Sequence, residues 1–167
     1  LVDDGPLAGV PTLVARHGKV VTFDAYGYKD VSARTPMTRD TIFRIASMTK
    51  PIAGVAMMML WEENKWALDD PVHRFIPEFK DLKVKTPGGL VPQSHPMTMR
   101  ELMSHTAGFD VSSGYEAANL TAGDLQAMID KLARLPLAAQ PSTDWRYGPS
   151  VNIQGYIVEK LSGQSLD

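Results

Sequence analysis

The hydrophobic pattern of the first forty residues is typical of β-strands. Two runs rich in β-branched and aromatic residues, 10–15 and 20–26, are separated by the polar residues 16–19. Gly18 in this link can supply the positive φ that a tight hairpin turn requires. The pattern therefore predicts an antiparallel hairpin. Because a hairpin alone is only marginally stable, we expect further strands to complete its sheet.

Apolar residues at helical spacing follow the strands. They recur three or four positions apart as Ile52, Val55, Ala56, Met59 and Leu60. This spacing predicts a buried helix over residues 47–64. Pro51 fits such a helix only in the first turn, where its missing N–H would have had no partner. The helix should therefore begin at or very near Ser47.

Three further helices are expected in the rest of the chain. Thr98 and Glu101 have the spacing of a capping box at a helix start. Thr121 precedes a second helix, and Gly163 stands where a third would end. The apolar stripes of these last two helices are Leu125, Met128, Ile129 and Leu132, and Ile153, Ile157 and Leu161. Residues 86–96, rich in proline and glycine, are expected to form a loop.

Composition narrows the possible functions. A chain of 167 residues with 44% hydrophobic and 22% charged residues is ordinary for one soluble globular domain. A net charge of −2 argues against a nucleic-acid-binding protein, and no apolar run has the length of a membrane span. The absence of cysteine excludes disulfides and thiol nucleophiles, and the four histidines lack metal-ligand spacing. We therefore expect neither a metal nor an organic cofactor. The absence of a leader at residue 1 favours a cytoplasmic over a periplasmic or secreted location, although the compartment is unknown.

One tetrad carries candidate chemistry. Ser47 and Lys50 form a Ser-x-x-Lys pattern, and residues three apart on a helix share a face, so the amine can reach the hydroxyl. A helix N-terminus adds partial positive charge near a developing oxyanion. Serine alone is a poor nucleophile, and a neutral or closely coupled lysine can take its proton. The pattern also arises by chance, so a helix-capping serine followed by a solvated lysine remains an alternative.

Four ordered segments, together spanning nearly the whole chain, resemble class C β-lactamases and family VIII carboxylesterases. The stretch TIFRIASMTKP at residues 41–51 resembles their nucleophile segment, and LDDPV and IPEF follow at 68–72 and 76–79. MTMRELMSHTAGF at 97–109 is similar to their Leu-Leu-x-His-Thr-Ser-Gly segment. WRY at 145–147, followed by GYIVEKLSG at 155–163, resembles their second motif and the helix after it.

This resemblance implies roles for individual residues. Ser47 would be acylated, Lys50 would hold and return the proton, and Tyr147 would act first as general base and then as acid. Because a phenol has an ordinary pKa near 10, Tyr147 needs a positive neighbour, and Lys50 is the candidate. By itself, Tyr147 could equally be a half-buried aromatic residue whose hydroxyl binds a backbone carbonyl. Trp145 is a candidate for lining the acyl pocket, and His105 is expected to hold the turn behind the site.

The sequence departs from the β-lactamase pattern immediately after Tyr147. Pro149 stands where class C β-lactamases have an asparagine that helps to hold the substrate amide. Proline has neither a side-chain amide nor an N–H, and Asn152 is an uncertain substitute three residues later. We therefore favour a carboxylesterase that acts on short-chain esters through an acyl-enzyme. The alternatives are a β-lactamase, a D-Ala-D-Ala carboxypeptidase or transpeptidase, an acyltransferase, and a catalytically silent binding scaffold of the same fold.

The resemblance also implies the fold. It is an α/β (α+β) β-lactamase/transpeptidase-like domain, with an antiparallel sheet flanked by helices. Residues 1–45 would supply N-terminal strands and residues 46–167 a mostly helical part of one catalytic domain. Members of the family are more than twice as long, so we expect the C-terminal strands and the second oxyanion-hole amide to lie outside this chain. A second chain or a C-terminal segment would then complete the fold, and the isolated polypeptide should be poorly active and prone to aggregate.

Overall fold

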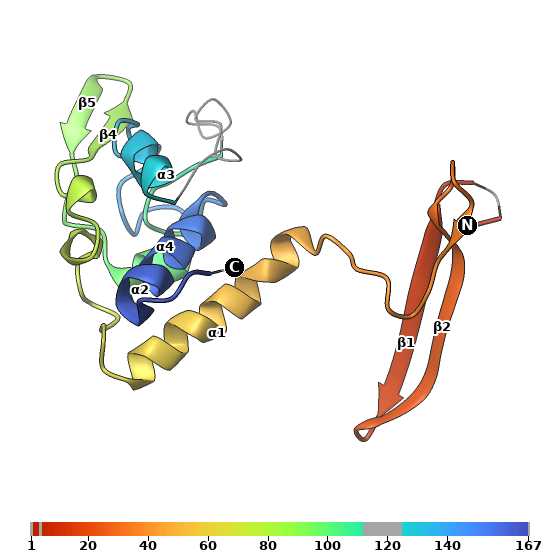
Figure 1. Ribbon diagram of the computed structural model, residues 1–167. Coiled ribbons are helices and arrows are strands. Elements are labelled where there is room, and N and C mark those ends of the chain that lie inside the picture. Colours follow the sequence, from red (N-terminus) through yellow and green to blue (C-terminus); the bar gives the residue numbers. More distant parts are fainter. Residues whose placement is uncertain (1, 4, 112–124, 167) are drawn as a thin grey trace. The chain divides into compact units, whose positions relative to one another are not determined.

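The chain forms two compact units, residues 1–46 and residues 47–167. The computed structural model describes residues 2–3, 5–111 and 125–166. The first unit is a small antiparallel sheet and the second is mostly helical (Figure 1). The boundary lies one residue from the division that the sequence predicted at 45/46. That both units belong to a single catalytic domain stays a prediction.

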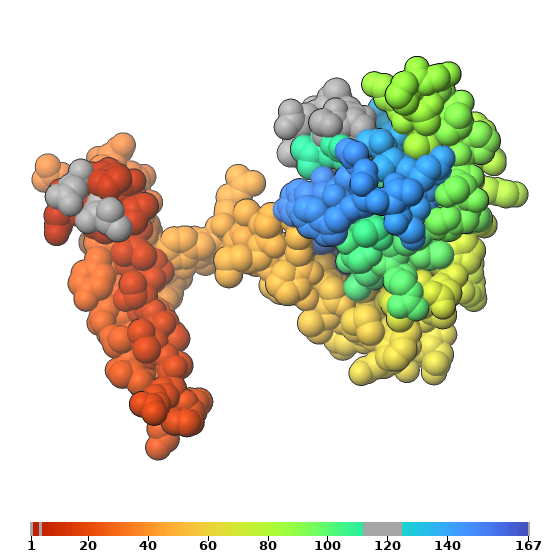
Figure 2. Space-filling view, turned by 180° about the vertical axis from the view of Figure 1, so that it is seen from behind, coloured from red at the N-terminus to blue at the C-terminus, as the bar shows by residue number. Residues whose placement is uncertain are grey.

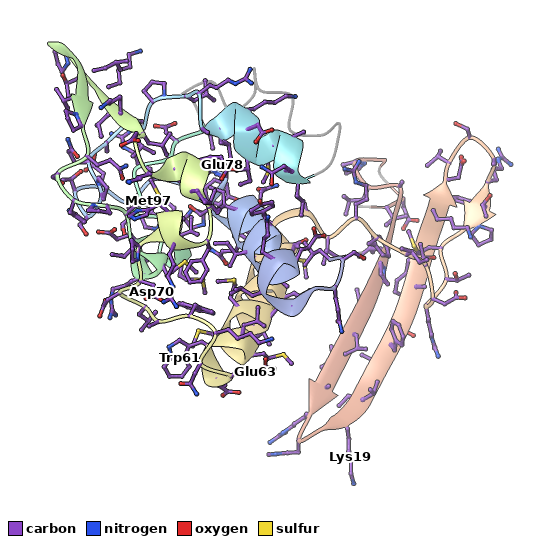
Figure 3. All side chains as sticks on the ribbon, turned by 60° about the vertical axis from the view of Figure 1, so that its left-hand side comes forward. Lys19, Trp61, Glu63, Asp70, Glu78 and Met97 are labelled. Atoms are coloured by element: carbon purple, nitrogen blue, oxygen red, sulfur yellow. The ribbon has the colours of Figure 1, made fainter. Side chains whose placement is uncertain are left out.

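The first unit contains the predicted hairpin. Its strands are β1 (Gly9–Arg16), β2 (Lys19–Asp30) and β3 (Thr35–Pro36), in the order β1-β2-β3. His17 and Gly18 link the first two strands with φ of 50° and 73°. Positive φ at both central residues is the geometry of a type I′ turn, whose twist matches that of the flanking strands. Lys19 lies at the tip of this hairpin (Figure 3).

The long helix of the second unit begins later than the sequence predicted. A short 3₁₀ turn (Ala46–Met48) precedes α1 (Thr49–Glu62), so Ser47 lies just before the α-helix. Pro51 is in the first turn of α1, as expected. The predicted burial is confirmed for Leu60 but was wrong for Ile52, Val55 and Met59, which are exposed. The other buried residues of α1 are Ala53 and Met57. Since apolar residues surround this helix on most sides, their spacing alone does not decide which face is buried.

A second small sheet replaces part of the predicted loop. After the 3₁₀ turns Val72–Arg74 and Pro77–Phe79, strand β4 (Lys83–Thr86) pairs antiparallel with β5 (Gly89–Pro92). The prediction of a loop over residues 86–96 was therefore wrong for Thr86 and for residues 89–92. Val84 is buried between two exposed lysines and forms a β-bridge with Leu137. This burial of alternate residues is what stabilises a short strand here.

Three helices complete the second unit: α2 (Met99–Met103), α3 (Leu125–Leu132) and α4 (Ser150–Ser162). The capping box is confirmed, because the Thr98 hydroxyl accepts from the Glu101 N–H and the Glu101 carboxylate accepts from the Thr98 N–H. Gly163 ends α4 with φ of 73°, as predicted. Thr121 lies outside the described residues. α4 contacts α1, α2 and α3 and is the central helix of this unit (Figure 1).

The core of the second unit surrounds α4. Among its fully buried side chains are Met57, Ile76, Phe79, Met99, Leu102, Ile129, Leu137, Ile153 and Ile157. Met97, at the start of the segment that leads into α2, is also buried (Figure 3). Each such side chain contributes about 1.5–3 kcal/mol relative to an exposed one. No helix within the described ranges combines the length and apolar character that crossing a membrane would require.

Candidate active site

The Ser47 hydroxyl is presented at the N-terminal end of α1. Ser47 is exposed and lies in the 3₁₀ turn, and Ala46 before it has a φ of 45°, which is uncommon for a residue other than glycine. The first turn of α1 contains no acidic side chain. No carboxylate in that turn therefore opposes the partial positive charge that the helix N-terminus places near this hydroxyl.

Ser47, Lys50 and Tyr147 meet at this point. The Lys50 ammonium donates to the Ser47 Oγ at 3.1 Å, which the three-residue spacing predicted. The Tyr147 hydroxyl lies 2.7 Å from the same Oγ, although the two residues are 100 positions apart. The Lys50 Nζ also lies 4.5 Å from the centroid of the Tyr147 ring. The serine oxygen is thus within hydrogen-bond distance of both a phenol and an ammonium group.

The surroundings of Tyr147 favour its ionised form. A hydrogen bond with Lys50 lowers the pKa of Tyr147 most, and the hydrogen bond with Ser47 and the positive charge of Lys50 lower it further. Partial burial opposes these effects, but the pKa remains below its ordinary value of 10.0. When the pKa of a phenol is lowered in this way, a larger fraction of it is deprotonated near neutral pH and can accept a proton.

His105 packs behind Tyr147. The two rings are stacked, with centroids 5.3 Å apart and planes 10° apart. Burial and the positive charge of Lys50 lower the pKa of His105, which keeps the imidazole neutral at pH 7. Its backbone carbonyl accepts from the Arg146 N–H at 2.8 Å. These contacts hold the segment that carries Tyr147, in keeping with the structural role expected of this histidine.

The two predicted substrate-binding residues lie on either side of Tyr147 in the sequence. Trp145 is 66% exposed, and its ring centroid lies 6.4 Å from that of Tyr147. Asn152 is exposed in the first turn of α4. The structure thus places Trp145 beside the Ser47–Lys50–Tyr147 group and Asn152 on the helix that follows. Their role in substrate binding stays a prediction.

Sequence reasoning missed a cluster around a buried carboxylate in the second unit. Glu101 is only 5% exposed and accepts from the Thr98 N–H at 2.7 Å, from the Ser142 hydroxyl and from His95, whose Nε2 is 2.7 Å away. Burial raises the pKa of Glu101, but these hydrogen bonds outweigh burial and lower it overall. Only the capping-box spacing of Glu101 could have indicated this cluster, because Ser142 lies 41 positions away.

A second missed group is an ion-pair cluster on the segment that carries Tyr147. The Arg146 guanidinium donates to the Asp110 carboxylate at 2.7 Å and to that of Asp144 at 3.0 Å. Asp110 comes directly after the segment that resembles the family, so the sequence contained no signal for this pairing. In the described ranges, no group of three or more histidine or acidic side chains is arranged to hold a metal ion.

Comparison with known proteins places this geometry in a family. A sequence model of the family described as Beta-lactamase matches residues 1–167. Esterase EstB of Burkholderia gladioli is 35% identical over 96% of this chain and 42% of the esterase. The solved structure of EstCE1, described as a hydrolase with promiscuous acyltransferase activity, is 33% identical with a TM-score of 0.85. That likeness covers 99% of this chain and 45% of EstCE1.

A third likeness extends to penicillin-binding proteins. The octameric penicillin-binding protein homologue from Pyrococcus abyssi is 29% identical with a TM-score of 0.76, over 98% of this chain and 37% of that protein. The chain therefore spans less than half the length of these relatives. Its mixed helix and antiparallel-sheet architecture is the β-lactamase/transpeptidase-like fold expected from the sequence. The chain belongs to the β-lactamase family, whose fold serves both hydrolases and acyltransferases.

Proposed function

We propose that this chain carries the nucleophile and proton-transfer groups of a serine hydrolase that acts on carboxylic esters through an acyl-enzyme at Ser47. The observation that carries the proposal is the convergence on one oxygen, the Ser47 Oγ, of the Tyr147 hydroxyl at 2.7 Å and the Lys50 ammonium at 3.1 Å. A nucleophile within hydrogen-bond reach of a base, with a further group that tunes the base, is the arrangement that nucleophilic catalysis needs.

In the proposed acylation step, the Ser47 Oγ attacks the ester carbonyl carbon while its proton passes to the Tyr147 oxygen. Lys50 prepares this transfer by lowering the pKa of Tyr147, so that more of the phenol is deprotonated and ready to accept the proton. The tetrahedral intermediate then collapses, and Tyr147 returns the proton to the departing alkoxide. The products of this step are the free alcohol and a Ser47 ester, so atoms and charge balance.

The second step releases the acyl group. Water attacks the Ser47 ester while Tyr147 accepts a proton from the water. The Ser47 oxygen then leaves and takes this proton from Tyr147, and the acyl group is released as a carboxylic acid. An alcohol that occupies the place of water would yield a new ester, so acyl transfer is the second candidate activity. The description of EstCE1 as a hydrolase with acyltransferase activity favours this candidate over a silent scaffold. A binding scaffold would also have no need for all three groups to converge.

Esters are favoured over β-lactams and peptides because of the residues that follow Tyr147. Pro149 lies at the N-terminus of α4 and offers no amide to hold a substrate N–H. An ester has no such N–H, so ester hydrolysis loses nothing by this change. The similarity to an esterase of Burkholderia gladioli points the same way. Trp145, exposed beside Tyr147, is proposed to contact the acyl or alcohol group of the ester.

The test is a comparison of substrates. The protein is purified at its full natural length and assayed with p-nitrophenyl acetate, p-nitrophenyl butyrate and a chromogenic cephalosporin, alongside Ser47→Ala and the control Ser104→Ala. Ser104 is in the same unit, but its hydroxyl binds backbone carbonyls and Thr106. We expect ester turnover that Ser47→Ala abolishes and Ser104→Ala retains, with cephalosporin turnover at least 100-fold lower in kcat/KM. Faster cephalosporin than ester turnover would contradict the ester proposal.

A further inference from the structure

The hydrophobic core does not fix the position of Tyr147. Its side chain is 42% exposed, and its ring contacts are His105, the exposed Trp145 and the Lys50 ammonium. The residue lies in an irregular segment before α4, and the helix start has no side-chain cap. Other interactions must therefore hold the phenol oxygen 2.7 Å from the Ser47 Oγ.

Arg146, directly before Tyr147, makes contacts of this kind. Its guanidinium donates to Asp110 at 2.7 Å and to Asp144 at 3.0 Å, while its backbone N–H donates to the His105 carbonyl at 2.8 Å. The Arg146 and Asp110 side chains are 36% and 16% exposed, so this pair is partly withdrawn from water. Charge-assisted hydrogen bonds at such sites are stronger and more directional than those of a fully exposed surface pair.

The backbone around Arg146 is packed closely against the segment that ends at Asp110. A Cβ added at Gly148 would lie 3.3 Å from the Asp110 nitrogen and 3.4 Å from the Phe109 carbonyl carbon. Farther back, the Ser142 N–H donates to the Thr106 carbonyl at 2.9 Å. Figure 2 shows this late segment (blue) against residues near 100–110 (green). The chain is thus held to residues 105–110 by hydrogen bonds before Tyr147 and lies close to the same residues at Gly148.

We infer that Arg146 is a positioning residue for Tyr147, and that its ion pair with Asp110 holds the phenol oxygen in reach of Ser47 and Lys50. The inference rests on the proposed role of Tyr147 as the base that acts on Ser47. Asp144 is more exposed, at 54%, and is part of the same irregular segment, so it orients the guanidinium but cannot anchor the segment to the rest of the unit. Asp110 supplies that anchor, because it belongs to the segment that holds His105.

The predicted consequence is specific to proton transfer. Without Arg146 the segment loses its anchor, and the Tyr147 oxygen spends less time within hydrogen-bond distance of Ser47 and Lys50. We expect the rate of Ser47 acylation to fall at least tenfold through kcat, with KM changed less than threefold. The pKa of Tyr147 should rise toward its ordinary value, because the hydrogen bonds that lower it become partly occupied.

The experiment compares Arg146→Ala with a matched control, Arg100→Ala. Arg100 also pairs with an aspartate at 3.0 Å, but both side chains are largely exposed, at 58% and 83%. Acylation by p-nitrophenyl acetate gives kcat and KM, and ultraviolet titration of each protein against its own Tyr147→Phe counterpart isolates the Tyr147 phenol. Arg146→Lys, which keeps the charge, should recover part of both properties. Circular dichroism verifies that each variant is folded.

The outcomes separate the positioning role of Arg146 from the proposed function of the chain. If Arg146→Ala acylates and titrates like Arg100→Ala, the positioning role is overturned. If the unchanged protein is not acylated at Ser47 but the Tyr147 titration still shifts in Arg146→Ala, the positioning role holds and the proposed function fails. If Arg146→Ala does not fold, Arg146→Gln takes its place, since its amide keeps some hydrogen bonding without the charge. An unaltered rate and titration in that variant would equally overturn the inference.

Discussion

Replacing Tyr147 with phenylalanine removes one oxygen and little else. The ring can keep its stack on His105 at 5.3 Å and its contact with the Lys50 ammonium at 4.5 Å, so the segment should retain its conformation. The variant loses the hydroxyl 2.7 Å from the Ser47 Oγ, a distance typical of a good O–H···O hydrogen bond. Proton transfer by a positioned group contributes about 10²- to 10⁴-fold to rate, or about 3–5 kcal/mol of activation free energy.

The assay is the kcat/KM for p-nitrophenyl acetate, measured from pH 5 to pH 10 for both proteins. In the unchanged protein the active form of Tyr147 is the deprotonated one, so the rate should rise with pH and level off above the pKa of Tyr147. Since that pKa is lowered, the midpoint of this rise should lie below pH 10. The phenylalanine variant should be at least 100-fold slower and lose this rising limb. A variant within threefold of the unchanged protein, with the same pH profile, would refute the assignment of Tyr147 as base.

Two further predictions concern stability, measured by urea unfolding. Glu101→Gln should cost about 1–3 kcal/mol at pH 7, because a buried group that accepts hydrogen bonds from three neighbours loses its charge. Folding lowers the pKa of Glu101, so its ionised carboxylate stabilises the fold above about pH 4.5, and this stabilisation disappears as the pH falls through the pKa of the folded state. The difference in unfolding free energy between the unchanged protein and Glu101→Gln should therefore be smaller at pH 3 than at pH 7. An equal difference at both pH values would contradict this. Gly108→Ala should cost at least about 2 kcal/mol, because φ is +92° and the new Cβ would lie 2.3 Å from the Ala139 carbonyl oxygen. Gly54→Ala, the same change within α1 with no atom within 4 Å, should instead stabilise by about 1 kcal/mol, and a comparable loss in both variants would contradict the steric argument.

Local sequence patterns predicted the elements whose geometry depends on local interactions. His17 and Gly18 adopt the positive φ that a two-residue turn needs, and the spacing of Thr98 and Glu101 corresponds to an observed capping box. The three-residue spacing of Ser47 and Lys50 likewise predicted a contact within one turn of chain. In each case the interacting groups are at most three residues apart, so propensity and spacing contain the necessary information.

Interactions between distant segments escaped the sequence analysis. The Arg146–Asp110 pair and the Glu101–Ser142 hydrogen bond join residues 36 and 41 positions apart, and no periodic pattern connects them. Tyr147 was linked to Ser47, 100 positions away, only through resemblance to a family. The face of α1 that is buried was also mispredicted, because the choice depends on how α4 packs against a helix that is apolar on most sides. The short strand β5 was missed because Pro87 and Gly88, directly before it, are residues that usually indicate a turn or loop.

The central claim is that Ser47 is the nucleophile. The most direct measurement is intact-mass spectrometry of the folded protein before and after brief exposure to a fluorophosphonate, with Ser47→Ala and Tyr147→Phe alongside and peptide mapping of the adduct. The account predicts one adduct per chain, located on Ser47, absent from Ser47→Ala and formed much more slowly in Tyr147→Phe. An adduct on another residue, or no adduct on the folded, unchanged protein at its full natural length, would contradict it.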